Sequence, residues 1–97
     1  MRFEWDSRKD AANQRKHRVS FDEAATVFAD PLAVIFDDEL HSVGERREII
    51  IGHSVVNRLL LVCFTERAED VPRIYSARPA TRAERIRYER YSQTRRG

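Results

Sequence analysis

The chain has 97 residues, of which 41% are apolar and 35% charged, and its net charge at pH 7 is +2. This length accommodates one domain with a modest core, so we expect residues 1–97 to form a single domain. No apolar run is long enough to cross a membrane, the first residues lack signal-peptide features, and the one cysteine, Cys63, excludes an internal disulfide, all of which favours a cytoplasmic location.

The N-terminal segment combines a short apolar stretch with a polar helix. Residues 3–5 are long enough only for an edge strand, and Asp6 or Ser7 can cap a helix that runs to about His17. This helix has little apolar surface beyond Ala12. Three of its polar side chains share one side of the helix: Lys9, Asn13 and Lys16. That side is either a solvated face or a surface turned towards an RNA or protein partner.

A second helix follows with a clear amphipathic pattern. Ser20 and Glu23 fit a capping box, in which each side chain bonds a free backbone amide, and Val19 is placed for a hydrophobic staple. Apolar residues recur at the spacing of one helix face: Phe21, Ala24, Ala25 and Phe28. Pro31 marks the end of this helix. His17 lies between the two helices, where satisfying a helix-end carbonyl is a commoner role for histidine than that of a general base.

The middle of the chain alternates apolar runs with short connections. Four segments have the composition of strands: residues 32–36, 46–54, 58–67 and 73–78. The connection at 37–45 is acidic, but neither its carboxylates nor the histidines of the chain have a metal-ligand spacing, so we predict no metal and no cofactor. Successive strands with tight connections favour an antiparallel sheet of four to five strands. With two N-terminal helices and one C-terminal helix, the expected fold is an α+β layer fold.

The last third of the chain is its most basic part. Residues 1–66 hold nine Lys or Arg and twelve Asp or Glu, whereas residues 67–97 hold nine Arg and four Asp or Glu, so the net charge of +2 divides into −3 and +5. This distribution indicates a polyanion or an acidic partner, with a solvated surface helix as the alternative explanation. Thr81 and Glu84 fit a capping box that starts the last helix.

Four arginines are expected near one edge of the sheet. Arg67 and Arg78 stand at the ends of two successive strands, and Arg82 and Arg85 on the first turns of the following helix. We expect their guanidinium groups to converge, and their planar forks of N–H donors suit phosphate oxygens. The alternative is that Arg67 and Arg78 form surface ion pairs with nearby glutamates, each worth about 0–1 kcal/mol.

A set of motifs spans nearly the whole chain. In the N-terminal half these are Phe3-Glu4-Trp5-Asp6, Lys9, Asn13, Lys16-His17, Phe21, Ala24 and Phe28-Ala29-Asp30-Pro31. In the C-terminal half they are Glu45-Arg46-Arg47, Ile51-Gly52, Thr65-Glu66-Arg67, Arg73-Ile74-Tyr75-Ser76-Ala77-Arg78, Ala80-Thr81, Glu84-Arg85 and Tyr88. In order and spacing they resemble the BrnT-type toxin family. Tyr75 departs from the family, where an aliphatic residue is usual, and so does Arg18, where glycine is usual.

The resemblance implies the toxin half of a bacterial type II toxin–antitoxin pair, with a fold like that of RelE-type ribonucleases. Such a toxin blocks translation and growth by cutting RNA, and a ribbon-helix-helix antitoxin (BrnA-like) holds it inactive. The toxin–antitoxin complex represses its own promoter, so operator DNA is bound only through the complex. Because such antitoxins are dimers, two copies of the toxin are expected in one complex. No membrane partner is implied.

The chemistry implied is metal-independent cleavage with the 2′-hydroxyl as nucleophile. The site must accept the hydroxyl proton, stabilise charge on the phosphorus oxygens and aid the leaving 5′-oxygen. The candidates for charge stabilisation are Arg67 and Arg78, and those for proton transfer are Tyr88, Glu84, Lys9 and His17. The residues assigned to RNA binding are Lys9, Lys16, Arg82 and Arg85. Because the sequence has no unmistakable nucleophile–base pair, the alternative function is a non-catalytic module that binds an antitoxin or nucleic acid in promoter autoregulation.

Overall fold

The computed structural model describes the backbone of residues 1–96 and the side chains as far as Ser92. The elements follow in the order α1 (Ser7–His17), α2 (Phe21–Thr26), the 3₁₀ turn η1 (Val27–Ala29), β1 (Val34–Asp37), the 3₁₀ turn η2 (Glu39–His41), β2 (Glu48–His53), β3 (Leu59–Ala68), β4 (Val71–Pro79) and α3 (Arg82–Arg96). The predicted α+β fold is confirmed, with four antiparallel strands in the order β1-β2-β3-β4. The predicted domain extends to Gly97, which lies outside the described residues. No helix among the described residues has the length and apolar character needed to span a bilayer.

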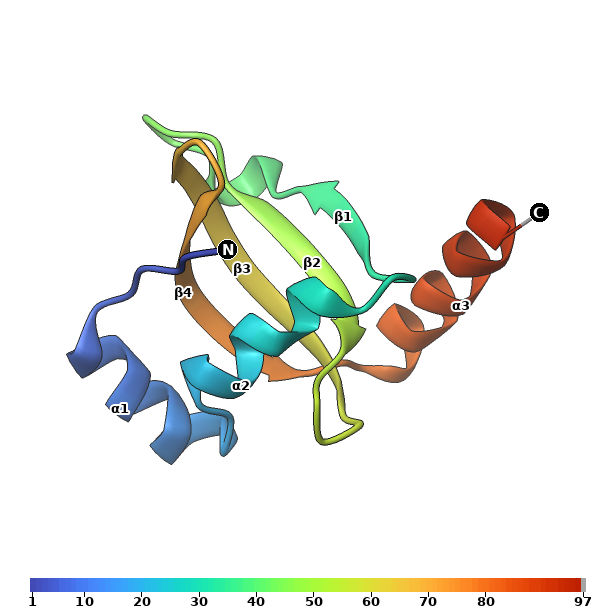
Figure 1. Ribbon diagram of the computed structural model, residues 1–97, viewed down its shortest axis with the longest axis horizontal. Helices are drawn as coiled ribbons and strands as arrows, with labels where there is room; N and C mark the ends of the chain where they lie inside the picture. The colour runs from blue at the N-terminus through green and yellow to red at the C-terminus, as the bar shows by residue number, and fades with distance from the viewer. Residues whose placement is uncertain (97) are drawn as a thin grey trace.

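The helices divide between the two faces of the sheet. In Figure 1, α2 lies across the front of the sheet and α1 lies beside β4. Helix α3 lies at the right of the view, on the same side of the sheet as β1. The face under α2 holds the main core: Val19, Phe21, Ala24, Val27, Ala33, Ile50, Leu60, Val62, Phe64, Ile74 and Ala77. Because alternate residues of a strand face opposite ways, the other face holds a second, smaller cluster: Val34, Ile51, Leu59, Leu61 and Tyr88.

The predicted first strand is reduced to a single bridge. Glu4 pairs with Arg73 in a parallel bridge at the outer edge of β4, and its amide donates to the carbonyl of Pro72 at 3.0 Å. The neighbouring rings still pack on the main core, since Phe3 meets Phe28 edge to face with 5.2 Å between ring centroids. This segment therefore covers the core and protects the edge of β4 without extending the sheet.

Helix α1 is held by its ends and by one buried side chain. Asp6 accepts hydrogen bonds from two amides of the first turn, and Arg18 closes the helix in the left-handed region with φ 57°. That conformation favours glycine, although arginine stands here. Asn13 is 7% exposed and its side-chain amide bonds both backbone groups of Ala77 in β4. Asn13 is therefore a structural tie, and only the two lysines of the predicted polar face are exposed.

The second helix is shorter than its amphipathic pattern indicates. It tightens into η1 after Thr26, so Val27 is fully buried and Phe28 is half-buried against Phe64. The chain then passes close to β2 at Gly52. A Cβ at this position would lie 3.0 Å from side-chain atoms of both Ala33 and Val27, so only glycine fits without a shift of its neighbours.

Of the two predicted capping boxes, one forms completely. Ser20 accepts from the amide of Glu23, but the Glu23 carboxylate bonds the guanidinium of Arg58 instead of returning to Ser20. At α3 both hydrogen bonds of the capping box are present. The Thr81 hydroxyl accepts from the Glu84 amide, and the Glu84 carboxylate accepts from the Thr81 amide. In place of the second half of the first capping box, an ion pair between Glu23 and Arg58 therefore joins α2 to the residue before β3.

A bulge interrupts the hairpin of β3 and β4. Cys63 pairs with Ser76, and the next residue of β3, Phe64, pairs with Ile74, so Tyr75 is the extra residue of β4. A bulge of this kind bends a strand and redirects one side chain. It determines where Tyr75 points relative to the open part of the sheet.

Candidate functional site

The face of the sheet that carries α3 has a covered half and an open half. In the covered half, Tyr88 of α3 packs on strand residues of the second cluster. In the open half, a cleft of about 290 Å³ is lined by Lys9, Asp38, His41, Arg47, Cys63, Tyr75 and Ser76. Cys63 and Ser76 are cross-strand neighbours and form its floor. We call this region the sheet cleft.

Tyr75 brings two cations together in the sheet cleft. The Lys9 ammonium lies 5.2 Å from the centroid of its ring, and the Arg47 guanidinium carbon lies 4.2 Å from it. The Tyr75 hydroxyl donates to the Glu45 carboxylate. Burial, and then the contact with Glu45, raise the pKa of Tyr75, while the positive charges of Arg47 and Arg67 act against this. Cation–π contacts thus hold two positive groups beside an open surface.

Asp38 and His41 form a hydrogen-bonded pair at the rim of the cleft. Nδ1 of His41 lies 2.9 Å from Oδ2 and 3.1 Å from Oδ1 of Asp38. The Asp38 side chain is 8% exposed, whereas that of His41 is 65% exposed. The Asp38 amide donates to the carbonyl of Arg47 at 2.9 Å, which ties the η2 turn to the start of β2. A buried carboxylate therefore orients an exposed imidazole.

Cys63 lies half-buried on the floor of the cleft. Burial raises the pKa of its thiol; the charge of Asp38 adds to this, and those of Arg78 and Arg47 oppose it. At neutral pH the thiol therefore keeps its proton and is a poor nucleophile. The same interactions show that Asp38, Arg47 and Arg78 all act on this floor.

The hairpin separates the two arginines that the sequence pattern places together. Arg78 pairs with Leu61, whereas Arg67 follows Glu66, which pairs with Pro72, six residues before Arg78. At about 3.3 Å per residue, the two positions are about 20 Å apart along the strands. The expected convergence is wrong because successive strands of a hairpin run in opposite directions, so their C-terminal ends lie at opposite ends of the hairpin.

Arg78 is held by a bidentate ion pair at the boundary with α3. Its two terminal nitrogens donate to the two Glu84 oxygens at 2.8 Å each. Arg78 lowers the pKa of Glu84, and Glu84 in turn raises that of Arg78. The ion pair that was the alternative explanation for Arg78 is thus present, yet its side chain remains 37% exposed. Arg78 can therefore still meet a ligand from a fixed position.

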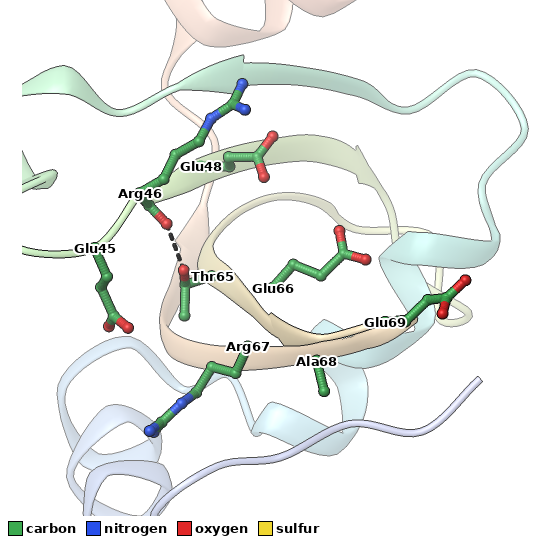
Figure 2. Close-up of a pocket in the computed structure, with 8 residues that line it drawn as sticks. All are labelled: Glu45, Arg46, Glu48, Thr65, Glu66, Arg67, Ala68 and Glu69. Carbon is green, nitrogen blue, oxygen red and sulfur yellow. Dashed lines mark hydrogen bonds between the residues drawn. The ribbon is translucent and has the colours of Figure 1, made fainter.

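Arg67 borders a larger and more acidic hollow at the other end of the hairpin. This open hollow of about 670 Å³ is lined by Glu45, Arg46, Glu48, Thr65, Glu66, Arg67, Ala68 and Glu69. Four of these eight residues are glutamates, which makes the hollow a poor surface for phosphate. In Figure 2, Arg67 and Glu45 extend to the side opposite Glu66 and Glu69. The positive charge of Arg67 also acts on the Tyr75 hydroxyl.

Tyr88 lies in the covered half of the face. It is 5% exposed, and its hydroxyl donates to Asp30 at 2.8 Å and lies 3.2 Å from Nδ1 of His53. Burial raises the pKa of Asp30, but hydrogen bonds from the amides of His53 and Leu32 and from Tyr88 outweigh it and leave the pKa lowered. This network fastens α3 to the sheet.

The remaining predicted residues lie outside the sheet cleft. Lys16 is exposed in the last turn of α1, which ends at the half-buried His17, and Arg82 and Arg85 are exposed at the start of α3. Of the predicted set, the structure brings Lys9 to Tyr75 and joins Arg78 to Glu84. Among the described residues, no group of three or more His, Cys, Asp or Glu side chains could hold a metal ion.

Sequence reasoning did not single out three residues of the cleft: Asp38, His41 and Arg47. The signal for the first two was the i, i+3 spacing in the polar connection, because a 3₁₀ turn stacks side chains three residues apart. Arg47 was indistinguishable from Arg46 in sequence. The structure turns Arg47 onto Tyr75 and pairs Arg46 with Asp37.

Comparisons with known proteins place these features in a family. A family model described as the ribonuclease toxin BrnT of type II toxin–antitoxin systems matches residues 5–84. The crystal structure of the ribonuclease toxin BrnT from Brucella abortus has a similar fold, with a TM-score of 0.64 at 21% identity, over 84% of this chain and 99% of that one. A comparison with curated proteins finds no match. The matched range ends in the first turn of α3, so the covered half owes its helix mostly to residues beyond the match.

Proposed function

Because the chain belongs to the BrnT family of ribonuclease toxins of type II toxin–antitoxin systems, we propose that it is a metal-independent endoribonuclease whose site is the sheet cleft. The observation that supports this most directly is the pairing of Lys9 and Arg47 on the ring of Tyr75, in the part of the sheet that α3 leaves open. Cationic side chains beside an accessible aromatic ring are a common way to bind single-stranded RNA.

The cations of the cleft are suited to the transition state of RNA cleavage. The 2′-oxygen attacks phosphorus and the bond to the 5′-oxygen breaks, which leaves a 2′,3′-cyclic phosphate and a 5′-hydroxyl. Negative charge gathers on the non-bridging oxygens as this happens. Arg47 and Lys9 are already fixed on Tyr75, so their N–H donors stabilise that charge with little reorganisation.

Arg67 and Arg78 serve different phosphates in this proposal. They lie at opposite ends of the hairpin, with the cleft floor between them, so one strand of RNA can pass from one to the other. Glu84 acts through Arg78, because a carboxylate with a lowered pKa is a weak base but a strong partner for a guanidinium. Tyr88 acts through α3, which it fastens at the border of the cleft.

Three exposed cations extend the RNA-binding surface beyond the cleft: Lys16, Arg82 and Arg85. Their contacts are with backbone phosphates and therefore carry little sequence preference. Cleavage of RNA in the cytoplasm accounts for arrest of translation and growth. Lys9 serves both the cleft and this wider RNA-binding surface, since it lines the cleft and lies on the exposed side of α1.

A type II toxin implies an antitoxin partner. We propose a ribbon-helix-helix antitoxin that lays an acidic segment over the sheet cleft and so competes with phosphate for its cations. As such antitoxins are dimers, the complex holds two copies of this chain and reaches operator DNA through the antitoxin. The contrast between the basic last third and the nearly balanced body of the chain supports an acidic partner.

A matched pair of neighbouring arginines tests the proposal. Purified protein is incubated with RNA in excess EDTA, and the Arg47→Ala variant is compared with Arg46→Ala. Loss of Arg47 should slow cleavage about a hundredfold, the usual cost of one charge-stabilising donor. The Arg46→Ala variant should cleave nearly as fast as the wild type, because Arg46 is 71% exposed and paired with Asp37. Arg67→Ala and Arg78→Ala should also slow cleavage while leaving the circular dichroism spectrum unchanged.

Each alternative has its own outcome in this assay. Cleavage that appears only when magnesium replaces EDTA would contradict metal independence. Tight RNA binding with no cleavage under either condition would favour the non-catalytic module that acts in promoter autoregulation. Equal rates for the Arg46 and Arg47 variants would move the site away from the sheet cleft.

A further inference from the structure

The Asp38–His41 pair leaves one nitrogen of the imidazole available as a base. A carboxylate oxygen can only accept, so the 2.9 Å contact from Asp38 Oδ2 places the ring proton on Nδ1 of His41. The lone pair then lies on Nε2, on the other side of the ring. Because the His41 side chain is 65% exposed at the rim of the cleft, this lone pair can meet a bound ligand.

The base and a cation of the cleft share one piece of hydrogen-bonded backbone. The Ser42 hydroxyl donates to the carbonyl of Asp38 at 2.6 Å and accepts from the amide of Arg47 at 3.0 Å. The Asp38 amide donates to the Arg47 carbonyl at 2.9 Å. The loop that carries His41 is therefore fixed to the residue that stacks on Tyr75. A proton acceptor and a phosphate-binding group held at a constant separation are what an in-line attack requires.

We propose, as an inference that rests on the proposed function, that His41 accepts the proton of the attacking 2′-hydroxyl and that Asp38 is its positioning residue. As the 2′-oxygen forms its bond to phosphorus, Nε2 takes the hydroxyl proton and the bond between phosphorus and the 5′-oxygen breaks. The 5′-oxygen takes up a proton from water. The imidazolium then returns its proton to solvent, so no other reactant is needed.

Several titratable or charged groups line the cleft together with His41. Asp38 directly precedes the η2 turn that holds His41. The other titratable or charged groups that line the cleft are Lys9 of α1, Arg47 in the connection before β2, Cys63 of β3 and Tyr75 of β4. Only neutral imidazole can accept the proton, so the rate should rise with pH through the range in which histidine titrates.

The test combines rate, affinity and pH profile for three variants. His41→Gln should slow cleavage of a short RNA by about a hundredfold or more, the usual contribution of a general base. Its affinity for the same RNA with 2′-deoxy sugars, which cannot react, should stay close to that of the wild type. Asp38→Asn should slow cleavage less and lower kcat while KM stays close to the wild-type value, because the imidazole loses its orienting partner and no RNA-binding group is removed. His53→Gln is the control, since His53 lies in the covered half beside Tyr88.

The outcomes separate this inference from the proposed function. If the wild type cleaves RNA, Arg47→Ala slows it, and His41→Gln cleaves at the wild-type rate with an unchanged pH profile, then His41 is not the base and the proposed function stands. A wild type that cuts no RNA in any condition overturns both. A folded Asp38→Asn variant that keeps the wild-type kcat, or that loses activity through KM alone, would overturn the role of Asp38 in positioning the imidazole.

Discussion

The covered and open halves of the α3-side face hold the same residue types in opposite surroundings. Each has a histidine, an aspartate and a tyrosine: His53, Asp30 and Tyr88 in the covered half, and His41, Asp38 and Tyr75 in the open half. Tyr88 is 5% exposed and gives its hydroxyl to Asp30, so that network serves the attachment of a helix. Tyr75 instead offers its ring to two cations beside a cleft. Residue types alone do not distinguish a structural network from a reactive one; burial and neighbouring charge do.

The boundary between the halves follows from local sequence. Pro79 cannot continue the ladder of β4, and the capping box of Thr81 and Glu84 starts α3 immediately afterwards. The helix therefore turns back over the ends of β1 and β2 and leaves the cleft uncovered. The family match includes every residue that lines the cleft but ends at Glu84, before Tyr88.

The largest expected effect distinguishes the two tyrosines by stability. Tyr88→Ala removes a buried ring and should lower the free energy of unfolding by roughly 3–5 kcal/mol. Tyr75→Ala removes a half-buried ring on an open surface and should cost roughly 1 kcal/mol. Urea denaturation of both variants measures the difference. Equal losses would show that the two halves are packed alike and would remove the contrast on which the cleft assignment depends.

Local patterns predicted the elements well because each depends on neighbours in sequence. The apolar stripe from Phe21, the strands and the helix start at Thr81 all follow from spacing, capping or the missing amide of Pro79. The cleft depends on pairing between distant segments, which spacing does not fix. The bulge at Tyr75, the side to which Arg47 turns and the separation of Arg67 from Arg78 all follow from strand register. The sequence therefore provided some candidates for the site, such as Lys9 and Arg78, but neither Asp38, His41 and Arg47 nor the grouping of these residues.

The next effect concerns the Asp30 network in acid. The pKa of Asp30 is lowered in the folded protein from an ordinary value of 3.8, because hydrogen bonds outweigh the effect of burial. The stabilisation is therefore complete above the unfolded pKa and is lost as pH falls through the folded pKa. Asp30→Asn should lower the free energy of unfolding at pH 7 by about 1–3 kcal/mol. The difference in stability between this variant and the wild type should become smaller as the pH falls and Asp30 of the wild type is protonated. Thermal melts across a pH series measure this; a gap independent of pH would contradict it.

A smaller effect is expected where the two halves meet. The Arg78–Glu84 pair is bidentate but partly exposed, so a double-mutant cycle should give a coupling energy of about 1 kcal/mol or less. If Arg78 contacts an RNA phosphate as proposed, the same Arg78→Ala variant should slow RNA cleavage by about a hundredfold. A large coupling energy with unchanged cleavage would make Arg78 part of the covered, structural half.

The smallest effect asks whether the RNA path stays within the open half. Arg82 and Arg85 are exposed at the start of α3, next to the boundary at Arg78. If both contact phosphates, each substitution by alanine should weaken RNA binding by a few-fold and reduce the slope of log affinity against log salt by about 0.7, the value for one contact on a single strand. Arg46→Ala serves as the matched control, because its guanidinium is paired with Asp37 away from the cleft. Binding is measured with 2′-deoxy RNA at several salt concentrations, so that cleavage does not interfere. Unchanged affinity and slope for the α3 variants would confine the RNA to the open half, and would leave the basic start of α3 for the acidic segment of the antitoxin alone.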